Sequence, residues 1–145
     1  TLLGKPTDEK DAYNILSMLN GNTHQVFTGI CLKQNKKTET FYCESKVHFK
    51  KVSDDFLKDY ISHYKPFDKA GSYGAQECLM PDKNYLSSKE IEFLKKIGKP
   101  DLFESSLAID KNKQVPLIDR IDGSYFNVMG LPIVELYEHL QKFNS

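Results

Sequence analysis

The segment 68–76, with the sequence DKAGSYGAQ, gathers residue types that could hold a charged ligand. The Asp68 carboxylate can bind a hydrated Mg²⁺ or hold a backbone turn, and the Lys69 ammonium can pair with it or with a phosphate. Gly71 and Gly74 free the backbone on either side of a tyrosine whose ring is able to pack. A well-ordered, glycine-rich bend without a ligand would use the same residue types. Both interpretations stay open on this segment alone.

Gln76 ends the segment with a side-chain amide, which has one acceptor oxygen and two N–H donors. The imide edge of uracil or thymine presents an acceptor, a donor and an acceptor in a row, and an amide is a natural partner for such an edge. Gln76 is therefore a candidate reader of a pyrimidine base.

A second candidate stretch lies near the start of the chain, in the sequence LLGKP at residues 2–6. Gly4 allows the backbone to pass close to a ligand, and Lys5 places a compact positive charge just before a predicted helix. A charge in that position suits a phosphate. The alternative is a solvated surface lysine before a helix, and the residues alone favour that alternative.

Composition and missing motifs exclude several classes of function. Acidic and basic residues both number 20, so the net charge of zero gives no long-range attraction to nucleic acid or to an anionic membrane. Arg120 is the only arginine, and the four histidines have no metal-ligand spacing. The patterns of P-loops, dinucleotide folds, zinc proteases and serine hydrolases are absent from the sequence.

Cysteine usage and hydropathy set expectations for localisation. The three cysteines, an odd number without C-x-x-C spacing, argue against a disulfide framework or a zinc finger and fit a reducing cytoplasm. No apolar run approaches the roughly 20 residues of a membrane-spanning helix, and no signal peptide opens the chain. We therefore expect a cytoplasmic protein whose partners include neither nucleic acid polymers nor membranes.

The helices that must position these candidates are predicted from N-caps and apolar spacing. The first covers residues 7–20 and is capped by Thr7. The second is capped by Ser53 and ends before Pro66, and the third has a Ser87–Glu90 capping box and ends at Gly98. A short helix is expected at 100–108, and the last helix starts at Pro132, with Val134, Tyr137 and Leu140 on its apolar face.

Strands are predicted between these helices. In residues 24–34 one face carries Val26, Thr28, Ile30 and Leu32, and the other carries Phe27 and Cys31. Residues 38–52 predict one long strand or two, with Val47 and Phe49 inward. Residues 115–128 predict a hairpin, because Asp122-Gly123 is a strong two-residue turn signal. The whole pattern predicts an α/β fold with a mixed sheet flanked by helices.

Five segments, in the order LLGKP, VFTGICL, ESKVHF, FDKAGSYGAQ and IDGSYFNVMGLPIVELYEHL, resemble the Maf family of nucleoside triphosphate pyrophosphatases. The resemblance covers most of the chain outside 77–114. It implies a fold related to the inosine triphosphate pyrophosphatases, and hydrolysis of a nucleoside triphosphate to the monophosphate and pyrophosphate with a divalent metal, Mg²⁺ or alternatively Mn²⁺. The GSYGAQ form looks like the branch that acts on dTTP, UTP and modified pyrimidine triphosphates.

The resemblance also implies roles for individual residues. Lys5 falls on the family's lysine near the phosphates, and Gln76 falls on a glutamine implicated in base selection. Asp68 and Lys69 are expected near the triphosphate. The family's S-x-S-P-R-R loop and A-D-T strand do not occur in this chain. We therefore expect the catalytic base to lie upstream of Thr1, and no catalytic or metal-binding residue is assigned.

The chain is thus predicted to be a single Maf-like domain, 1–145, incomplete at its N-terminus, with a lysine-rich surface insertion at about 77–114 that carries no chemistry. It is either a fragment or a product that has lost its active core, and the chain by itself is expected to be inactive. A non-catalytic nucleotide-binding or interaction module related to septum formation is the alternative function, and a structural remnant is the third. A homodimer is left open.

Overall fold

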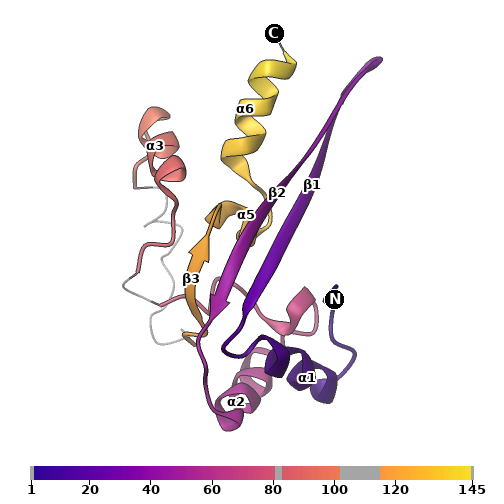
Figure 1. Ribbon diagram of the computed structural model, residues 1–145, viewed down its shortest axis with the longest axis vertical. Coiled ribbons are helices and arrows are strands. Elements are labelled where there is room, and N and C mark those ends of the chain that lie inside the picture. Colours follow the sequence, from indigo (N-terminus) through magenta and orange to yellow (C-terminus); the bar gives the residue numbers. More distant parts are fainter. Residues whose placement is uncertain (1, 81–82, 102–114, 145) are drawn as a thin grey trace. The chain divides into compact units, whose positions relative to one another are not determined.

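The computed structural model describes residues 2–80, 83–101 and 115–144. Its elements are α1 (Glu9–Leu19), β1 (Thr23–Gln34), β2 (Lys37–Phe49), α2 (Asp54–Tyr64), the 3₁₀ turn η1 (Ala70–Ser72), α3 (Ser88–Lys96), β3 (Ile118–Asp122), α5 (Tyr125–Met129) and α6 (Ile133–Phe143) (Figure 1). The three strands form one antiparallel sheet in the order β1-β2-β3. The expected α/β class is confirmed. The helix expected at 100–108 lies mostly outside the described residues.

Helix starts follow the capping signals of the sequence in most cases. Ser53 caps α2 and Ser87 caps α3, the latter with the predicted capping box. The cap of α1 is Asp8, whose carboxylate accepts from the Asp11 N–H over 2.8 Å. The prediction of Thr7 was wrong because the Thr7 N–H donates to the Asp11 carboxylate over 2.9 Å, which keeps Thr7 outside the helix.

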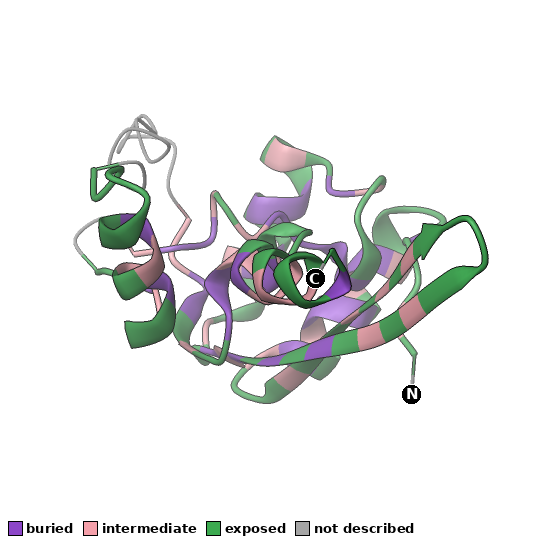
Figure 2. Ribbon diagram, turned by 90° about the horizontal axis from the view of Figure 1, so that it is seen from above, coloured by how far each residue is buried: buried purple, intermediate pink, exposed green. Residues whose placement is uncertain are grey.

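The β1–β2 hairpin shows the predicted alternation of burial along both strands (Figure 2). On β1, Val26 is half-buried and its neighbour Phe27 is exposed. Residues 37–49 form a single long strand, and Val47 and Phe49 on it are buried. The predicted inward face is therefore confirmed.

The hairpin predicted at Asp122-Gly123 does not form. β3 ends at Asp122, and Ser124 starts α5 by accepting from the Asn127 N–H over 3.0 Å. Gly123 has φ 103°, and a Cβ on it would lie 3.1 Å from the carbonyl oxygen of Glu44. The glycine thus serves a close approach between backbones, and the serine next to it provides a helix cap that overrides the turn signal.

The chain divides into two compact units, which are described separately. The first contains Thr1–His24, His48–Lys83 and Ile109–Arg120, and the second contains Gln25–Val47, Asn84–Ala108 and Ile121–Ser145. The prediction of one domain with an insertion stays a prediction. Among the described residues, no helix has the length and apolar character needed to cross a membrane.

The core of the first unit lies between α1 and α2. Leu16 of α1 and Leu57 and Ile61 of α2 are buried, and these two helices contact one another. α1 also contacts η1. This packing gives the residues that follow α2 a fixed support.

In the second unit α3 packs against α6, and the rings of Phe93 and Tyr137 meet edge to face with centroids 5.3 Å apart. Val134 is buried as predicted. Leu140, predicted on the apolar face, is exposed. The His139 ring stacks on Phe41 at 3.8 Å, so the side of α6 toward β2 includes a polar ring rather than leucine.

The described part of the tract 77–114 is not confined to the surface. Its buried residues are Cys78, Leu79, Tyr85, Glu90 and Leu94. The surface interpretation was wrong for the described part because apolar positions between its lysines, among them Leu79 and Leu94, are buried. Burying these side chains contributes to the core, since a fully buried leucine is worth about 1.5–3 kcal/mol.

Candidate functional site

The glycine loop, defined as residues 68–77, follows α2 and contains backbone in the left-handed region. Gly71 has φ 81° and Ser72 has φ 63°. A Cβ at Gly71 would lie 3.0 Å from Cε1 of Tyr73, so glycine is needed there. Ser72 is fully buried, and its hydroxyl has no hydrogen-bond partner in the described part of the chain. Left-handed backbone at a serine costs about 1–3 kcal/mol, and strain of this kind concentrates at functional sites.

A backbone hydrogen bond joins the two candidate stretches of the sequence. The Gly71 N–H donates to the Gly4 carbonyl over 3.2 Å. The backbone beside Lys5 therefore lies against the glycine loop, and the Lys5 side chain is exposed next to that junction. A Cβ on Gly4 would meet nothing within 4 Å, so the close approach predicted for this glycine is not required by the protein's own atoms.

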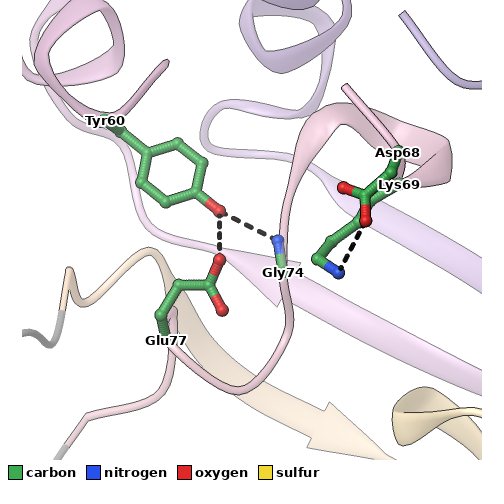
Figure 3. A network of polar contacts seen from close by, with 5 residues as sticks. All are labelled: Tyr60, Asp68, Lys69, Gly74 and Glu77. Atoms are coloured by element: carbon green, nitrogen blue, oxygen red, sulfur yellow. Dashed lines mark hydrogen bonds and ion pairs between the residues drawn. The ribbon is translucent and has the colours of Figure 1, made fainter. Parts of the chain in front are cut away.

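Asp68 and Lys69 form an exposed ion pair (Figure 3). The Lys69 Nζ lies 3.7 Å from Oδ2 of Asp68, with 46% and 78% of the respective side chains exposed. Such a pair contributes only about 0–1 kcal/mol because water screens it. Both charges can therefore turn toward a ligand at little cost in stability.

Gln76 is exposed at the far end of the glycine loop. The backbone on either side of it is held. The Ala75 carbonyl accepts from the Cys78 N–H over 3.2 Å, and the Glu77 carbonyl accepts from the Val115 N–H over 2.8 Å. The base-reading role of Gln76 stays a prediction.

Two residues that the sequence interpretation missed hold this loop. The Tyr60 hydroxyl accepts from the Gly74 N–H over 2.9 Å and donates to Oε1 of Glu77 over 3.1 Å (Figure 3). Burial raises the pKa of the Tyr60 phenol far above its usual range, so the hydroxyl keeps its proton and stays a donor. One signal could have found it. Tyr60 lies on the buried face of α2, and a buried tyrosine hydroxyl needs a partner.

The Glu77 carboxylate lies directly beside Gly74. A Cβ at position 74 would lie 2.2 Å from Oε1 and 2.4 Å from Oε2 of Glu77. The carboxylate thus occupies the space that a side chain would take. Backbone freedom was predicted for Gly74, but its φ lies outside the left-handed region; the glycine instead leaves room for the Glu77 carboxylate.

Tyr73 packs its ring into the core, as the sequence predicted. Its ring meets those of Phe49 at 5.0 Å and His24 at 6.0 Å, both edge to face. Burial raises the pKa of the Tyr73 phenol and lowers the pKa of the His24 imidazole. This tyrosine therefore supports the loop from beneath.

Metal-ligating side chains do not cluster in the described residues. No group of three or more His, Cys, Asp or Glu side chains there could hold a metal ion. The cysteines are free thiols, with Cys31 exposed and Cys43 and Cys78 buried.

His48 lies between Thr23 and Arg120. The Thr23 hydroxyl oxygen is 2.8 Å from Nδ1 of His48, and a guanidinium nitrogen of Arg120 is 3.3 Å from Nε2. Since arginine can only donate, Nε2 accepts and Nδ1 carries the proton toward Thr23.

Comparison with known proteins places the chain among related sequences. The family described as Maf-like protein matches residues 1–81 and 83–143. A dTTP/UTP pyrophosphatase of Porphyromonas gingivalis is 36% identical over 145 residues, covering 100% of this chain and 56% of the relative. Proteins of the same name from Flavobacterium psychrophilum (38% over 138 residues, 95% of this chain and 53% of the relative) and Bacillus cereus (32% over 143 residues, 99% and 56%) are also similar.

The chain spans about half the length of these curated relatives. The family match extends through the described part of 77–114 as well as through both candidate stretches. Because that match takes in nearly every residue, the chain belongs to the Maf-like protein family.

Proposed function

We propose that this chain supplies the nucleotide-binding segments of a nucleoside triphosphate pyrophosphatase that acts on dTTP, UTP or modified pyrimidine triphosphates. In this reaction water attacks the α-phosphorus, the bond from that phosphorus to the oxygen bridging to the β-phosphate breaks, and monophosphate and pyrophosphate leave. The observation that carries the proposal is the Gly71 to Gly4 hydrogen bond, which brings the LLGKP and DKAGSYGAQ stretches together. The shared name of the relatives supports the substrate class.

The residues of the chain divide the work of binding. Lys5 and Lys69 are exposed ammonium groups on the joined stretches and neutralise phosphate charge. Gln76 pairs with the imide edge of the base and disfavours bases that leave its amide unpaired. The catalytic base is not assigned to a residue of this chain.

A divalent cation fits the exposed carboxylate of Asp68. Mg²⁺ keeps several waters and binds through one or two carboxylates together with substrate phosphates, so it needs no cluster of protein ligands. Asp68 would hold such an ion, Mg²⁺ or alternatively Mn²⁺, beside the phosphates. The bound metal would supply charge neutralisation and a water of lowered pKa. A cytoplasmic location, a homodimer, and the absence of nucleic acid and membranes among the partners stay predictions.

Pyrophosphate release with Mg²⁺ tests the function. The panel is dTTP, UTP, 5-methyl-UTP, 7-methyl-GTP and ITP, and the proteins are this chain and a longer polypeptide that includes the coding sequence upstream of Thr1. We expect turnover of the pyrimidine triphosphates by the longer polypeptide. Binding without turnover by both proteins would instead establish the non-catalytic nucleotide-binding module.

Matched variants test the assigned residues. Lys5→Gln is expected to lower kcat/KM at least about tenfold, because it removes a charge aimed at the phosphates. The control Lys10→Gln removes an exposed lysine of α1 and should leave the rate unchanged. Gln76→Ala should reduce selectivity among bases, whereas Gln34→Ala at the end of β1 should not. Equal effects within either pair would contradict the assignment.

A further inference from the structure

A single hydroxyl bridges the stretch of the glycine loop that contains Gln76. Tyr60 accepts from the Gly74 N–H over 2.9 Å and donates to the Glu77 carboxylate over 3.1 Å. It therefore links the two ends of residues 74–77, with Gln76 between them. Figure 3 shows both bonds converging on the one phenolic oxygen.

The bridge rests on a rigid element. Tyr60 is 1% exposed, on a helix whose N-terminus is capped by Ser53, and its ring stacks on Tyr64 with centroids 5.2 Å apart and an interplanar angle of 24°. A side chain locked by packing holds its polar atom in one place. The position of the hydroxyl is thus set by α2 and not by the loop.

The carboxylate end of the bridge is fixed by shape and by backbone. The Glu77 carboxylate lies against Gly74, in the space where a Cβ would be 2.2 Å from Oε1. The Glu77 carbonyl is held by the Val115 N–H over 2.8 Å. Side chain and main chain of the residue next to Gln76 are therefore both anchored, while Gln76 itself is exposed.

We infer that Tyr60 and Glu77 are positioning residues that set the base selectivity of Gln76, an inference that rests on the proposed function. An amide discriminates between bases only when its oxygen and N–H groups face the edge of the base in register, and a displacement of about 1 Å is enough to lose that match. The bridged loop supplies the register. Neither Tyr60 nor Glu77 needs to touch the substrate.

The test compares kcat/KM for dTTP with kcat/KM for CTP in the longer polypeptide. The edge of cytosine carries an amino donor and a ring-nitrogen acceptor where thymine has an acceptor and a donor, so the ratio reports on the register of Gln76. Tyr60→Phe keeps the ring and removes the hydroxyl, and we expect the ratio to fall about tenfold. The control Tyr13→Phe on α1 should leave it unchanged.

Two substitutions at position 77 separate positioning from general damage. Glu77→Gln keeps an oxygen that can accept from Tyr60 and should hold the ratio within about threefold, since the bond is retained without its charge. Glu77→Ala removes the acceptor and should lower the ratio as Tyr60→Phe does. A loss of stability alone would reduce kcat/KM for both nucleotides equally and leave the ratio where it was, which would overturn the inference.

Hydrogen exchange on this chain tests the bridge without relying on activity. In Tyr60→Phe the Gly74 amide should exchange about tenfold faster, because it has lost its acceptor, while amides in α1 keep their rates. Unchanged exchange at Gly74 would overturn the inference. If the wild-type longer polypeptide turned over no triphosphate, the proposed function would be overturned as well. If the wild type were selective but Tyr60→Phe left the ratio of kcat/KM for dTTP to that for CTP unaltered, the inference alone would be overturned.

Discussion

Glu90→Gln should destabilise the protein far more than the same change at an exposed glutamate of the same helix. Glu90 is 1% exposed, and its carboxylate accepts five hydrogen bonds. Oε1 accepts from the N–H and hydroxyl of Ser87, both over 3.0 Å, and from the Tyr125 N–H over 2.9 Å. Oε2 accepts from the Ser124 hydroxyl and the Phe126 N–H, both over 2.9 Å.

The size of the effect follows from what an amide can offer to these donors. Glutamine replaces one carboxylate oxygen by an NH₂ group. This replacement costs least free energy at Oε2, because one backbone N–H donates to Oε2 whereas two donate to Oε1. At that position the NH₂ group would face the Phe126 N–H, which would lose its acceptor. A buried N–H donor without an acceptor costs about 1–3 kcal/mol. The bonds that remain lose the strengthening of a charged acceptor, which roughly doubles a neutral bond. We expect a total loss of about 2–4 kcal/mol in the free energy of unfolding.

Urea unfolding followed by far-UV circular dichroism measures this loss. With a denaturant slope of about 2 kcal/mol/M, the midpoint should fall by about 1–2 M. Glu92→Gln is the matched control, because Glu92 lies on α3 two residues away and is exposed. Its effect should stay within about 0.5 kcal/mol.

The reasoning would be refuted by a loss below about 1 kcal/mol for Glu90→Gln, the size of one ordinary hydrogen bond. Equal losses for Glu90→Gln and Glu92→Gln would refute it too. In either case the carboxylate would not be the acceptor on which Tyr125 and Phe126 depend. A change in the denaturant slope, rather than in the midpoint, would point to an altered unfolded or native state and would not count as support.

Four further predictions concern the glycine loop and titration. Gly74→Ala should lower the free energy of unfolding by about 1–3 kcal/mol in the same urea assay, because its Cβ displaces the Glu77 carboxylate, which would lie 2.2 Å away, from its partner. Asp68→Asn should change stability by less than about 1 kcal/mol, since its ion pair is exposed, yet weaken Mg²⁺-dependent nucleotide binding measured by calorimetry. Stability should fall in alkali, because burial raises the pKa of Tyr125 to about 12 and raises that of Cys78 as well. The unfolded chain then loses these protons first, so the urea midpoint should be highest below pH 9 and decline above it. In acid the unfolded chain binds a proton at His24 before the folded chain does, because burial lowers the pKa of His24 in the folded state. The urea midpoint should therefore decline below about pH 6.5, and this decline should be smaller in His24→Asn.

Elements whose signals are local were predictable from the sequence. Ser53 and Ser87 cap their helices because the donor that each satisfies lies three residues away, within the same short stretch. The same local reasoning failed at Asp122-Gly123, where two signals compete. A two-residue turn and a cap at Ser124 share the glycine, and packing of Gly123 against Glu44 decides for the cap. That contact joins residues far apart in sequence and cannot be obtained from a pattern.

The candidate site shows the same division. The motif indicated Asp68, Lys69 and Gln76, and these three side chains are exposed along one loop. The contact between Tyr60 and Glu77 was not predictable from a local pattern, because the hydrogen bond spans 17 positions and depends on how α2 is rotated about its axis. Glycine spacing alone could not reveal that Gly74 is small to admit a carboxylate.

The tract 77–114, expected to carry no chemistry, contributes a carboxylate to the support of two segments of the resemblance, namely DKAGSYGAQ and the SYF segment at residues 124–126. In the first unit, Glu77 accepts a hydrogen bond from the Tyr60 hydroxyl, and that hydroxyl accepts from the Gly74 N–H of the glycine loop. In the second unit, Glu90 accepts from the Tyr125 and Phe126 N–H groups. Loops and helix starts leave backbone donors without partners, and a buried carboxylate is the side chain able to satisfy several at once. Removing the tract would leave the donors of the SYF segment buried and unpaired. Deletion of the tract should therefore destabilise the segments that the family resemblance singled out.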